Sequence, residues 1–275
     1  MSFINLCKER FNNCKSVLCI GLDPVIEKIP FKDQSNIEKK ISDFYYSIID
    51  NFQKYAIAVK PNIAFYEQYG IDGYNALKNI IKRAKKYDIP VILDAKRGDI
   101  GNTSKAYAKA AFEELKVDAI TLSPYLGEDS LIPFFEYKDK GFFILVRTSN
   151  SGSNDIQLLE LKNNKILYQE IANKIIDWNK KYSTGIGAVI GATHINELKD
   201  IISVFKNNIF IPILIPGVGS QGGDFKQVIN ILNKFEYPLH IVFINSSSKI
   251  NYAYLDHPEK DFFEATFIEI KKMLI

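Results

Sequence analysis

Short apolar runs recur along the chain, and almost every one is followed by a longer amphipathic stretch. Because strands with one face in water alternate apolar and polar residues, uninterrupted apolar runs indicate strands that are buried on both faces. The pattern predicts eight strands, at residues 17–23, 55–62, 89–96, 117–124, 141–149, 185–192, 211–219 and 240–248. Apolar residues at helical spacing predict helices between them, most clearly at residues 74–87, 166–182, 197–205, 225–235 and 260–275.

The alternation of strands and helices predicts parallel βα units, and eight of them predict a (β/α)8 TIM barrel of the α/β class. A doubly wound open sheet is the alternative, because a count of strands does not establish closure. Neither a Pro/Gly/Ser-rich linker nor a shift in composition divides the chain, which predicts a single domain over residues 1–275. Residues 150–164 form the longest insertion after a strand and are a candidate lid.

The amino-acid composition excludes several classes of protein. Of the 275 residues, 47% are hydrophobic and 24% are charged, which excludes a disordered chain. The strongly apolar run at 209–215 contains Pro212 and is far shorter than the about 20 residues that a membrane-spanning helix needs. The formal charge is +3 and the lysines are scattered, so nothing indicates nucleic-acid binding.

Cysteine usage points to a reducing compartment. Cys7, Cys14 and Cys19 are odd in number and form no C-x-x-C pair, and the segment MSFINLCKER lacks the apolar core of a secretory leader. We therefore expect a cytoplasmic protein. The three thiols are expected to be small buried residues on a leading helix and the first strand.

Candidate chemistry lies where the predicted strands end, because barrels of this type build their active sites at the carboxyl ends of the strands. Asp94 and Lys96 are two residues apart on the third strand, so regular alternation places both side chains in the barrel mouth. Lys60 arrives from the neighbouring strand, and Asp99 lies in the loop beyond, where it could reach an adjacent site. Polar residues close other strands as well, namely Asp23, Asn62, Thr148, Ser149 and Asn245 to Ser248.

A buried ion pair that only closes the barrel is the structural alternative for Lys60, Asp94 and Lys96. Desolvated charges stabilise a fold less well than apolar packing, so a function is the better reason for their presence.

A glycine-rich stretch, PGVGSQGGD at 216–224, follows the seventh strand. Glycines at 217, 219, 222 and 223 let the backbone approach an anion, and the next helix, capped by Asp224, presents N–H groups at its start. Such barrels often hold a phosphate between the loops after strands seven and eight, so the stretch predicts a phosphate site. A plain glycine-rich turn is the alternative.

Other reaction classes find no support in the sequence. His194, His240 and His257 lack metal-ligand spacing, so no metal is expected. The sequence Gly-x-Ser-x-Gly follows none of the predicted strands, which argues against serine hydrolase chemistry.

Together these motifs resemble a known family. Residues 94–103, DAKRGDIGNT, are similar to the D-x-K-x-x-D-I-x-x-T signature of orotidine 5'-phosphate decarboxylase, the last enzyme of UMP synthesis. The remaining motifs follow in the family's order and resemble its longer bacterial branch: GLDP at 21–24, VKPN at 59–62, SPYLG at 123–127, RTSN at 147–150, VIGAT at 189–193, PGVGSQGGD at 216–224 and NSS at 245–247.

The resemblance implies a cofactor-independent decarboxylation of orotidine 5'-phosphate to UMP, and a role for each matching residue. Asp94 would face the substrate carboxylate, and Lys96 would donate a proton to C6. Asp99 and Thr103 would reach into the site of a second subunit, which implies a homodimer with shared active sites. The remaining implied contacts are Asp23, Lys60 and Asn62 with the ribose, Ser149 with the pyrimidine edge, and Gly219 and Gln221 with the phosphate. From the glycine-rich stretch itself we expect the amides from Gly217 onward to share in binding the phosphate.

Two departures from the family pattern affect binding. The family has arginine after Asn-x-Ser to clasp the phosphate, whereas this chain has Ser248 followed by Lys249, and a lysine supplies only a point charge. Ser151 stands where the long branch tends to have proline, which loosens the expected lid.

Two other functions compete with decarboxylation. A metal-dependent sugar-phosphate lyase of the same superfamily needs an acidic ligand at the end of strand two, where this chain has Lys60. A non-catalytic nucleotide-binding barrel would account for the missing arginine, but the intact array of Asp94, Lys96 and Asp99 argues against it.

Overall fold

The computed structural model describes residues 1–31, 36–208, 211–219 and 222–275. Within these residues eight strands form one parallel sheet in the order β2-β1-β8-β7-β6-β5-β4-β3. Two isolated parallel bridges, Val59 with Val91 and Asn62 with Asp94, join β2 to β3 and close the ring. This arrangement confirms the predicted TIM barrel. The strands are β1 (Leu18–Leu22), β2 (Ala58–Pro61), β3 (Ile92–Arg97), β4 (Ala119–Leu122), β5 (Gly141–Arg147), β6 (Gly185–Ile190), β7 (Ile213–Ile215) and β8 (Val242–Ser246).

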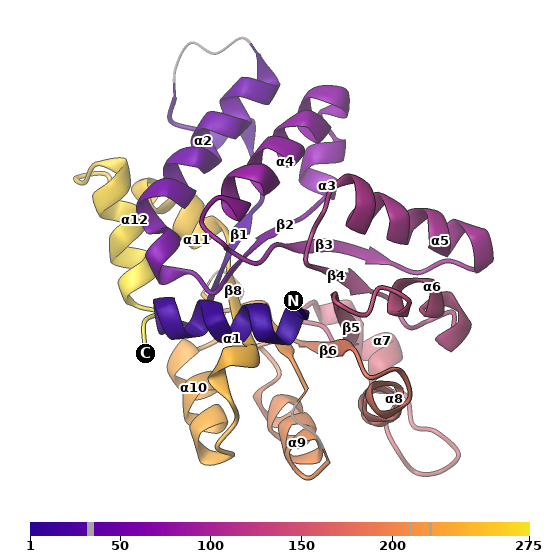
Figure 1. Ribbon diagram of the computed structural model, residues 1–275. Coiled ribbons are helices and arrows are strands. Elements are labelled where there is room, and N and C mark those ends of the chain that lie inside the picture. The colour runs from indigo at the N-terminus through magenta and orange to yellow at the C-terminus, as the bar shows by residue number, and fades with distance from the viewer. Residues whose placement is uncertain (32–35, 209–210, 220–221) are drawn as a thin grey trace.

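Helices surround the strands (Figure 1). In the described part of the chain none of them is long and apolar enough to cross a membrane. The helices are α1 (Phe3–Cys14), α2 (Ile37–Phe52), α3 (Ala64–Glu67), α4 (Gly70–Lys85), α5 (Gly101–Lys109), α6 (Ile132–Phe135), α7 (Asn154–Gln157), α8 (Leu167–Tyr182), α9 (Ile195–Lys206), α10 (Phe225–Lys234), α11 (Ser248–Asn251) and α12 (Phe262–Lys271).

The strands are shorter than the apolar runs that predicted them, and β7 shows why. The predicted run covers 211–219, but the strand ends at Ile215, before Pro216, which has no N–H for the ladder. Gly217 and Gly219 then adopt φ values of 94° and 82°, which turn the chain away from the sheet. Apolar composition therefore marks burial here, and the strand itself ends at the first residue that cannot pair.

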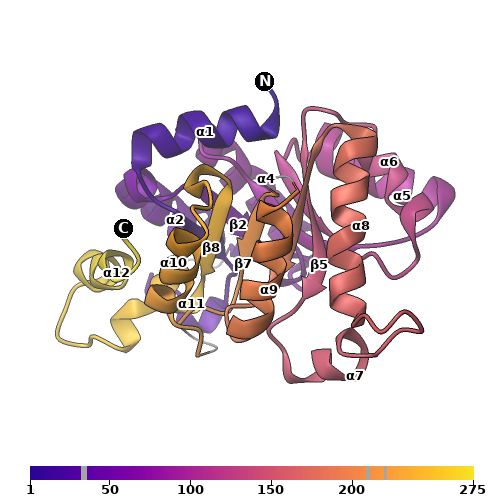
Figure 2. The same cartoon turned by 90° about the horizontal axis from the view of Figure 1, so that it is seen from below.

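Helix α1 lies across the end of the barrel opposite α7 and α11 (Figure 2). Its first residue, Phe3, is buried, and its ring centroid lies 5.9 Å from those of both Phe143 and Phe243. A Cβ on Gly141 would come within 2.5 Å of the Phe3 ring, so the ring occupies the space that this glycine leaves. Phe3 therefore closes the amino-terminal end of the barrel.

All three cysteines were expected to be buried, and the structure confirms this for Cys7 and Cys19 but not for Cys14. Cys7 on α1 and Cys19 on β1 are buried, whereas Cys14 is half-buried, and all three thiols are free. Burial raises the pKa of the Cys19 thiol to about 12. A thiol that stays protonated at neutral pH is a poor nucleophile, so Cys19 is a structural residue.

We predict that Phe3→Ala lowers the free energy of unfolding by about 3–5 kcal/mol, because it leaves a cavity between Phe143 and Phe243. Urea unfolding measures this loss. Phe263→Ala is the control, since that ring is 43% exposed. Equal losses in the two variants would show that Phe3 does not close the barrel.

Candidate active site

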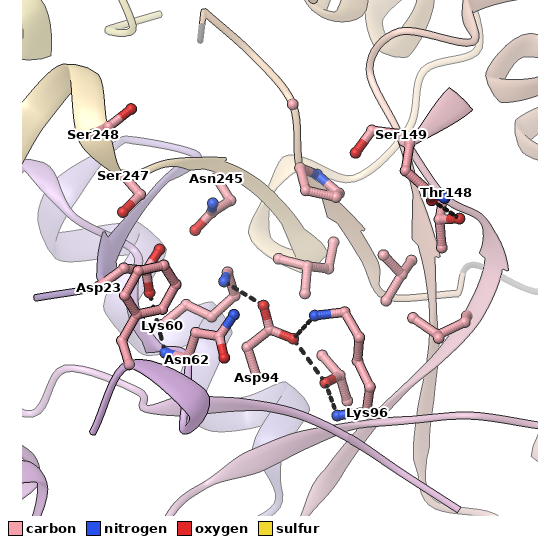
Figure 3. A pocket seen from close by; sticks show the side chains of 18 of the residues that line it. Asp23, Lys60, Asn62, Asp94, Lys96, Thr148, Ser149, Asn245, Ser247 and Ser248 are labelled. Atoms are coloured by element: carbon pink, nitrogen blue, oxygen red, sulfur yellow. Dashed lines mark hydrogen bonds and ion pairs between the residues drawn. The ribbon is translucent and has the colours of Figure 1, made fainter. Parts of the chain in front are cut away.

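A cavity of about 610 Å³ opens at the carboxyl ends of the strands. Side chains from opposite sides of the barrel line this cavity. Figure 3 shows Ser247 and Ser248 across the cavity from Thr148 and Ser149. The predicted residues that line it are Asp23, Lys60, Asn62, Asp94, Lys96, Ser149 and Gly217. The structure thus brings seven predicted site residues, from five different strands or the loops that follow them, to one mouth.

Asp94 on β3 is the centre of this site. Its Oδ2 accepts a hydrogen bond of 2.7 Å from Lys60 Nζ on β2, and its Oδ1 accepts one of 2.6 Å from Lys96 Nζ. Thr121 on β4 donates to the same Oδ1 at 3.0 Å. Figure 3 shows the carboxylate between the two ammonium groups. One negative charge therefore lies between two positive ones, with both oxygens bonded.

The backbone around Lys96 does not follow regular strand alternation. Lys96 has a φ of 46°, and the pairing of β3 with β4 shifts register between Leu93 and Arg97. The amides of Ala95 and Lys96 both donate to Thr121 Oγ1, at 3.0 and 2.9 Å. The prediction that the Asp94 and Lys96 side chains meet is confirmed, but a bulge pinned by Thr121 brings them together, and the expected regular alternation is wrong.

Burial and charge act against each other at Asp94. Burial alone would raise the pKa of its carboxyl, but the ammonium groups of Lys60 and Lys96 hold that pKa well below its usual range. Burial would lower the pKa of Lys60, and the Asp94 carboxylate raises it above the ordinary lysine value. Asp94 and Lys60 are therefore both ionised at neutral pH, while the Lys96 side chain stays 48% exposed to the cavity.

Asp23 and Asn62 form a second polar group beside the array. Asp23 Oδ1 accepts from the Asn62 amide at 3.2 Å, and Asn62 Oδ1 accepts from the Ala64 amide at 3.2 Å. Tyr252 fixes the same turn, because its hydroxyl donates to the Asp23 carbonyl at 3.1 Å and accepts from the Val25 amide at 2.7 Å. Both side chains are thus held at the cavity wall.

The segment after β5 is tied down by a buried arginine that sequence reasoning missed. Arg147 is 1% exposed, and its guanidinium donates to Ser153 Oγ at 2.6 Å and Asn154 Oδ1 at 2.7 Å. It also lies 3.4 Å from Glu197 Oε1 and 3.3 Å from His194 Nδ1. These contacts anchor the candidate lid to the loop after β6.

Gln157 links this candidate lid to the cavity. Its Oε1 accepts from the Thr148 amide at 2.8 Å, and its Nε2 donates to Thr148 Oγ1 at 2.9 Å. Gln157 also lines the cavity, together with Asn150. The contact could not be predicted from the sequence, because the segment between Thr148 and Gln157, which are nine residues apart, shows no regular pattern. The short helix α7 brings the Gln157 side chain back to Thr148.

The glycine-rich loop adopts the backbone that its composition predicts. Gly222 has a φ of 88°, and a Cβ on Gly223 would lie 2.6 Å from the Cβ of Ala192. Asp224 caps α10 as predicted, accepting from the amides of Lys226 and Gln227. Three glycine amides donate within the loop, from Gly219 to the Gly223 carbonyl, from Gly222 to the Gly219 carbonyl and from Gly223 to the Gly217 carbonyl. Gln221 lies outside the described residues.

Four of the predicted residues do not line the main cavity. Asp99 is half-buried and accepts from the Ile100 amide at 2.8 Å, and Thr103 is exposed on α5. Gly219 and Lys249 line a neighbouring cavity, where Lys249 Nζ lies 2.7 Å from Asp256 Oδ2. The structure therefore separates the charged group around Asp94 from these four predicted residues, which do not line its cavity.

A TIM barrel with a charged array at the carboxyl ends of its strands and a glycine-rich loop after β7 is typical of barrel enzymes that act on phosphorylated small molecules. Residues 16–242 match the model of the orotidine 5'-phosphate decarboxylase / HUMPS family. The chain belongs to this family.

Similar proteins agree with this assignment. An orotidine 5'-phosphate decarboxylase of Herpetosiphon aurantiacus is 48% identical over 216 residues, 78% of each chain. The structure of Leishmania donovani OMP decarboxylase superposes with a TM-score of 0.77 at 33% identity, covering 99% of this chain and 98% of the other. Leishmania donovani UMP synthase gives 0.80 at 34% identity, covering 99% of this chain but 56% of that longer one.

We predict that Asp94→Asn lowers the free energy of unfolding by about 3–5 kcal/mol, because Lys60 is left buried without its counter-charge. Because the pKa of Asp94 is lowered in the folded protein, its carboxylate contributes fully to the free energy of unfolding above the ordinary carboxyl pKa. That contribution is lost only as the pH falls through the pKa of Asp94 in the folded protein. Because the pKa of Lys60 is raised in the folded protein, its ammonium group contributes fully to the free energy of unfolding below the ordinary lysine pKa. That contribution is lost as the pH rises through the pKa of Lys60 in the folded protein. The loss should therefore be constant between about pH 5 and 9.

Urea unfolding of both proteins at several pH values checks this prediction. Glu236→Gln is the control, since Glu236 pairs with Lys206 at the surface with its side chain 86% exposed. A loss in Asp94→Asn no larger than in the control would contradict the account of a buried, charged array.

Proposed function

We propose that this protein decarboxylates orotidine 5'-phosphate to UMP without a cofactor, as the last step of de novo pyrimidine biosynthesis. The carrying observation is the hydrogen-bonded array of Lys60, Asp94 and Lys96 in a member of the decarboxylase family. The three free cysteines fit a place in the reducing cytoplasm.

The chemistry requires that charge be stabilised where it develops. The bond between C6 and the carboxylate breaks, CO2 leaves, and the electron pair remains on C6. Lys96 Nζ, half-exposed in the cavity, places an ammonium beside that charge and then transfers one proton to C6, which yields UMP. Water returns a proton to the amine. Enzymes lower barriers by about 8–23 kcal/mol, and no single ion pair supplies that much.

Binding energy from the rest of the nucleotide supplies the remainder, because it holds the substrate carboxylate near Asp94. Asp23 and Asn62 bind the ribose hydroxyls, and Lys60 holds both the sugar and Asp94. Ser149 reads the pyrimidine edge. The phosphate lies at the glycine-rich loop, beside Gly217 and Gly219, with Gln221 and Lys249 as its side-chain contacts. The Gly219 amide is bonded to the Gly223 carbonyl, so this glycine contributes the room for a close approach and not a free N–H group.

We propose a homodimer with shared sites, because Asp99 and Thr103 lie outside their own cavity. Apolar side chains are exposed on the loops after the paired strands β3 and β4: Ile100 is 59% exposed, Tyr125 81% and Leu126 46%. Exposed apolar side chains of this size favour contact with another protein surface. A second copy of the chain would cover them and bring its Asp99 and Thr103 to the neighbouring site.

Loss of orotidine 5'-phosphate absorbance, measured with purified protein in excess chelator, tests the activity. We expect turnover with one UMP formed per substrate consumed. Turnover that the chelator abolishes would favour the metal-dependent lyase, although Lys60 stands where that enzyme needs an acidic ligand. Binding of UMP without turnover would favour the non-catalytic barrel.

Lys96→Ala should abolish decarboxylation while UMP still binds, because the variant loses the proton donor but keeps the ribose and phosphate contacts. Turnover and a binding isotherm for UMP measure the two properties. Lys199→Ala, which removes an exposed lysine on α9, is the control and should behave as wild type. If Lys96→Ala keeps a tenth of wild-type turnover, Lys96 is not the donor.

Mixing Lys96→Ala with Asp99→Ala protein should restore activity, although each variant alone is inactive. In a heterodimer both lesions fall in one shared site and the other site is intact. Random exchange of equal amounts should give about a quarter of wild-type turnover for a two-fold dimer. Exchange demonstrated with affinity tags, but with turnover at background, would show that Asp99 does not act across subunits.

A further inference from the structure

One lysine of the main cavity has no role in the proposed chemistry. In the described part of the chain, three lysines line this cavity, Lys28, Lys60 and Lys96, together with the carboxylates of Asp23 and Asp94. Lys60 and Lys96 both bond to Asp94. Lys28 makes no ion pair with any described acidic side chain, so it supplies the cavity's excess positive charge.

Lys28 is held against the segment that follows β8, far away in sequence. It ends the 3-10 helix η1 (Ile26–Lys28) after β1, and its carbonyl accepts from the Tyr254 hydroxyl at 2.5 Å. Its ammonium lies 5.6 Å from the centre of the Tyr252 ring. Because Tyr252 also lines the cavity and bonds to the backbone at Asp23 and Val25, it fixes the turn that carries Lys28.

The same segment after β8 is where this chain lacks an arginine. Ser247 and Ser248 line the cavity there, and their hydroxyls carry no charge. Lys249 lines the neighbouring cavity and is bonded to Asp256. The amides of Gly219, Gly222 and Gly223 already donate hydrogen bonds to carbonyl groups of their own loop. An anion beside Gly217 and Ser248 would therefore meet Lys28 as the one unpaired cation among the described residues of this cavity.

We propose that Lys28 binds the substrate phosphate from the loop after β1 and replaces the arginine that is absent after β8. This inference rests on the proposed function. The Lys28 ammonium rests against the Tyr252 ring. Because it has no ion pair with a described carboxylate, binding a phosphate would not require it to break one. Lys249 acts from the outer side of Gly219, so the contributions of the two lysines are separable.

Binding of UMP and of uridine to Lys28→Ala, measured by calorimetry, tests the proposal. Charge-assisted hydrogen bonds of the expected kind correspond to a loss of about ten- to a hundredfold for UMP. Uridine, which lacks the phosphate, should lose less than about twofold in affinity on the same scale. Lys28→Arg should restore most of the UMP affinity, because it keeps the charge.

Lys54→Ala is the matched control. Lys54 lies 5.0 Å from the Tyr55 ring in a similar contact, but just before β2, at the other end of the barrel. It should leave both affinities unchanged. Lys249→Ala, measured in parallel, should reduce UMP affinity without abolishing the effect of Lys28→Ala.

Two results would overturn the proposal. Equal losses for UMP and uridine in Lys28→Ala would make Lys28 a support of the loop. Unchanged UMP affinity in that variant, with a phosphate-selective loss in Lys249→Ala alone, would assign the arginine's role to Lys249. Wild-type protein that binds UMP but does not decarboxylate would contradict the proposed function, and the contrast between UMP and uridine would still decide the role of Lys28.

Discussion

The carboxylate of Asp94 accepts hydrogen bonds from Lys60, Lys96 and Thr121, and these three residues come from three neighbouring strands. Removal of such charges from water is costly, so the array persists only where the rest of the fold holds each partner in place. Closure of the barrel holds Lys60 and Asp94 in place, because the isolated bridge between Asn62 and Asp94 joins β2 to β3 next to this ion pair. The bulge at Lys96 sets the position from which that side chain enters the cavity.

This arrangement suits a reaction in which the substrate loses a carboxylate and leaves negative charge on carbon. Asp94 stays ionised at neutral pH, and a second carboxylate beside it would be unfavourable unless binding elsewhere held it there. On the proposed function the remote contacts therefore matter as much as the array. Asp23, Asn62 and the proposed phosphate cations are the candidates for these contacts, and Arg147 holds Ser153 and Asn154 in the candidate lid.

The sequence predicted the strands and the main site because both depend on local pattern. Apolar runs marked each strand, and the polar residues that close them marked Asp23, Lys60, Asn62 and Asp94. Thr121 could have been found as the one polar side chain in the fourth strand, AITL. The bulge at Lys96 could not, because it depends on pairing with β4.

Contacts between distant segments escaped prediction for a physical reason. Lys28 meets Tyr252 across more than two hundred residues, and only the closed ring of strands makes β1 and β8 neighbours. Arg147 meets His194 and Glu197 in the same way, through the pairing of β5 with β6. Residue spacing carries no information on such contacts until the order of strands is known.

The charge state of Asp94 is the central claim, and carbon-13 NMR tests it directly. Protein labelled at the aspartate carboxyl carbons is titrated from pH 8 to pH 4, and Asp94→Asn identifies the signal of Asp94. The account predicts the chemical shift of an ionised carboxylate throughout, with no titration. A midpoint at or above the ordinary aspartate value of about 3.9 would contradict it.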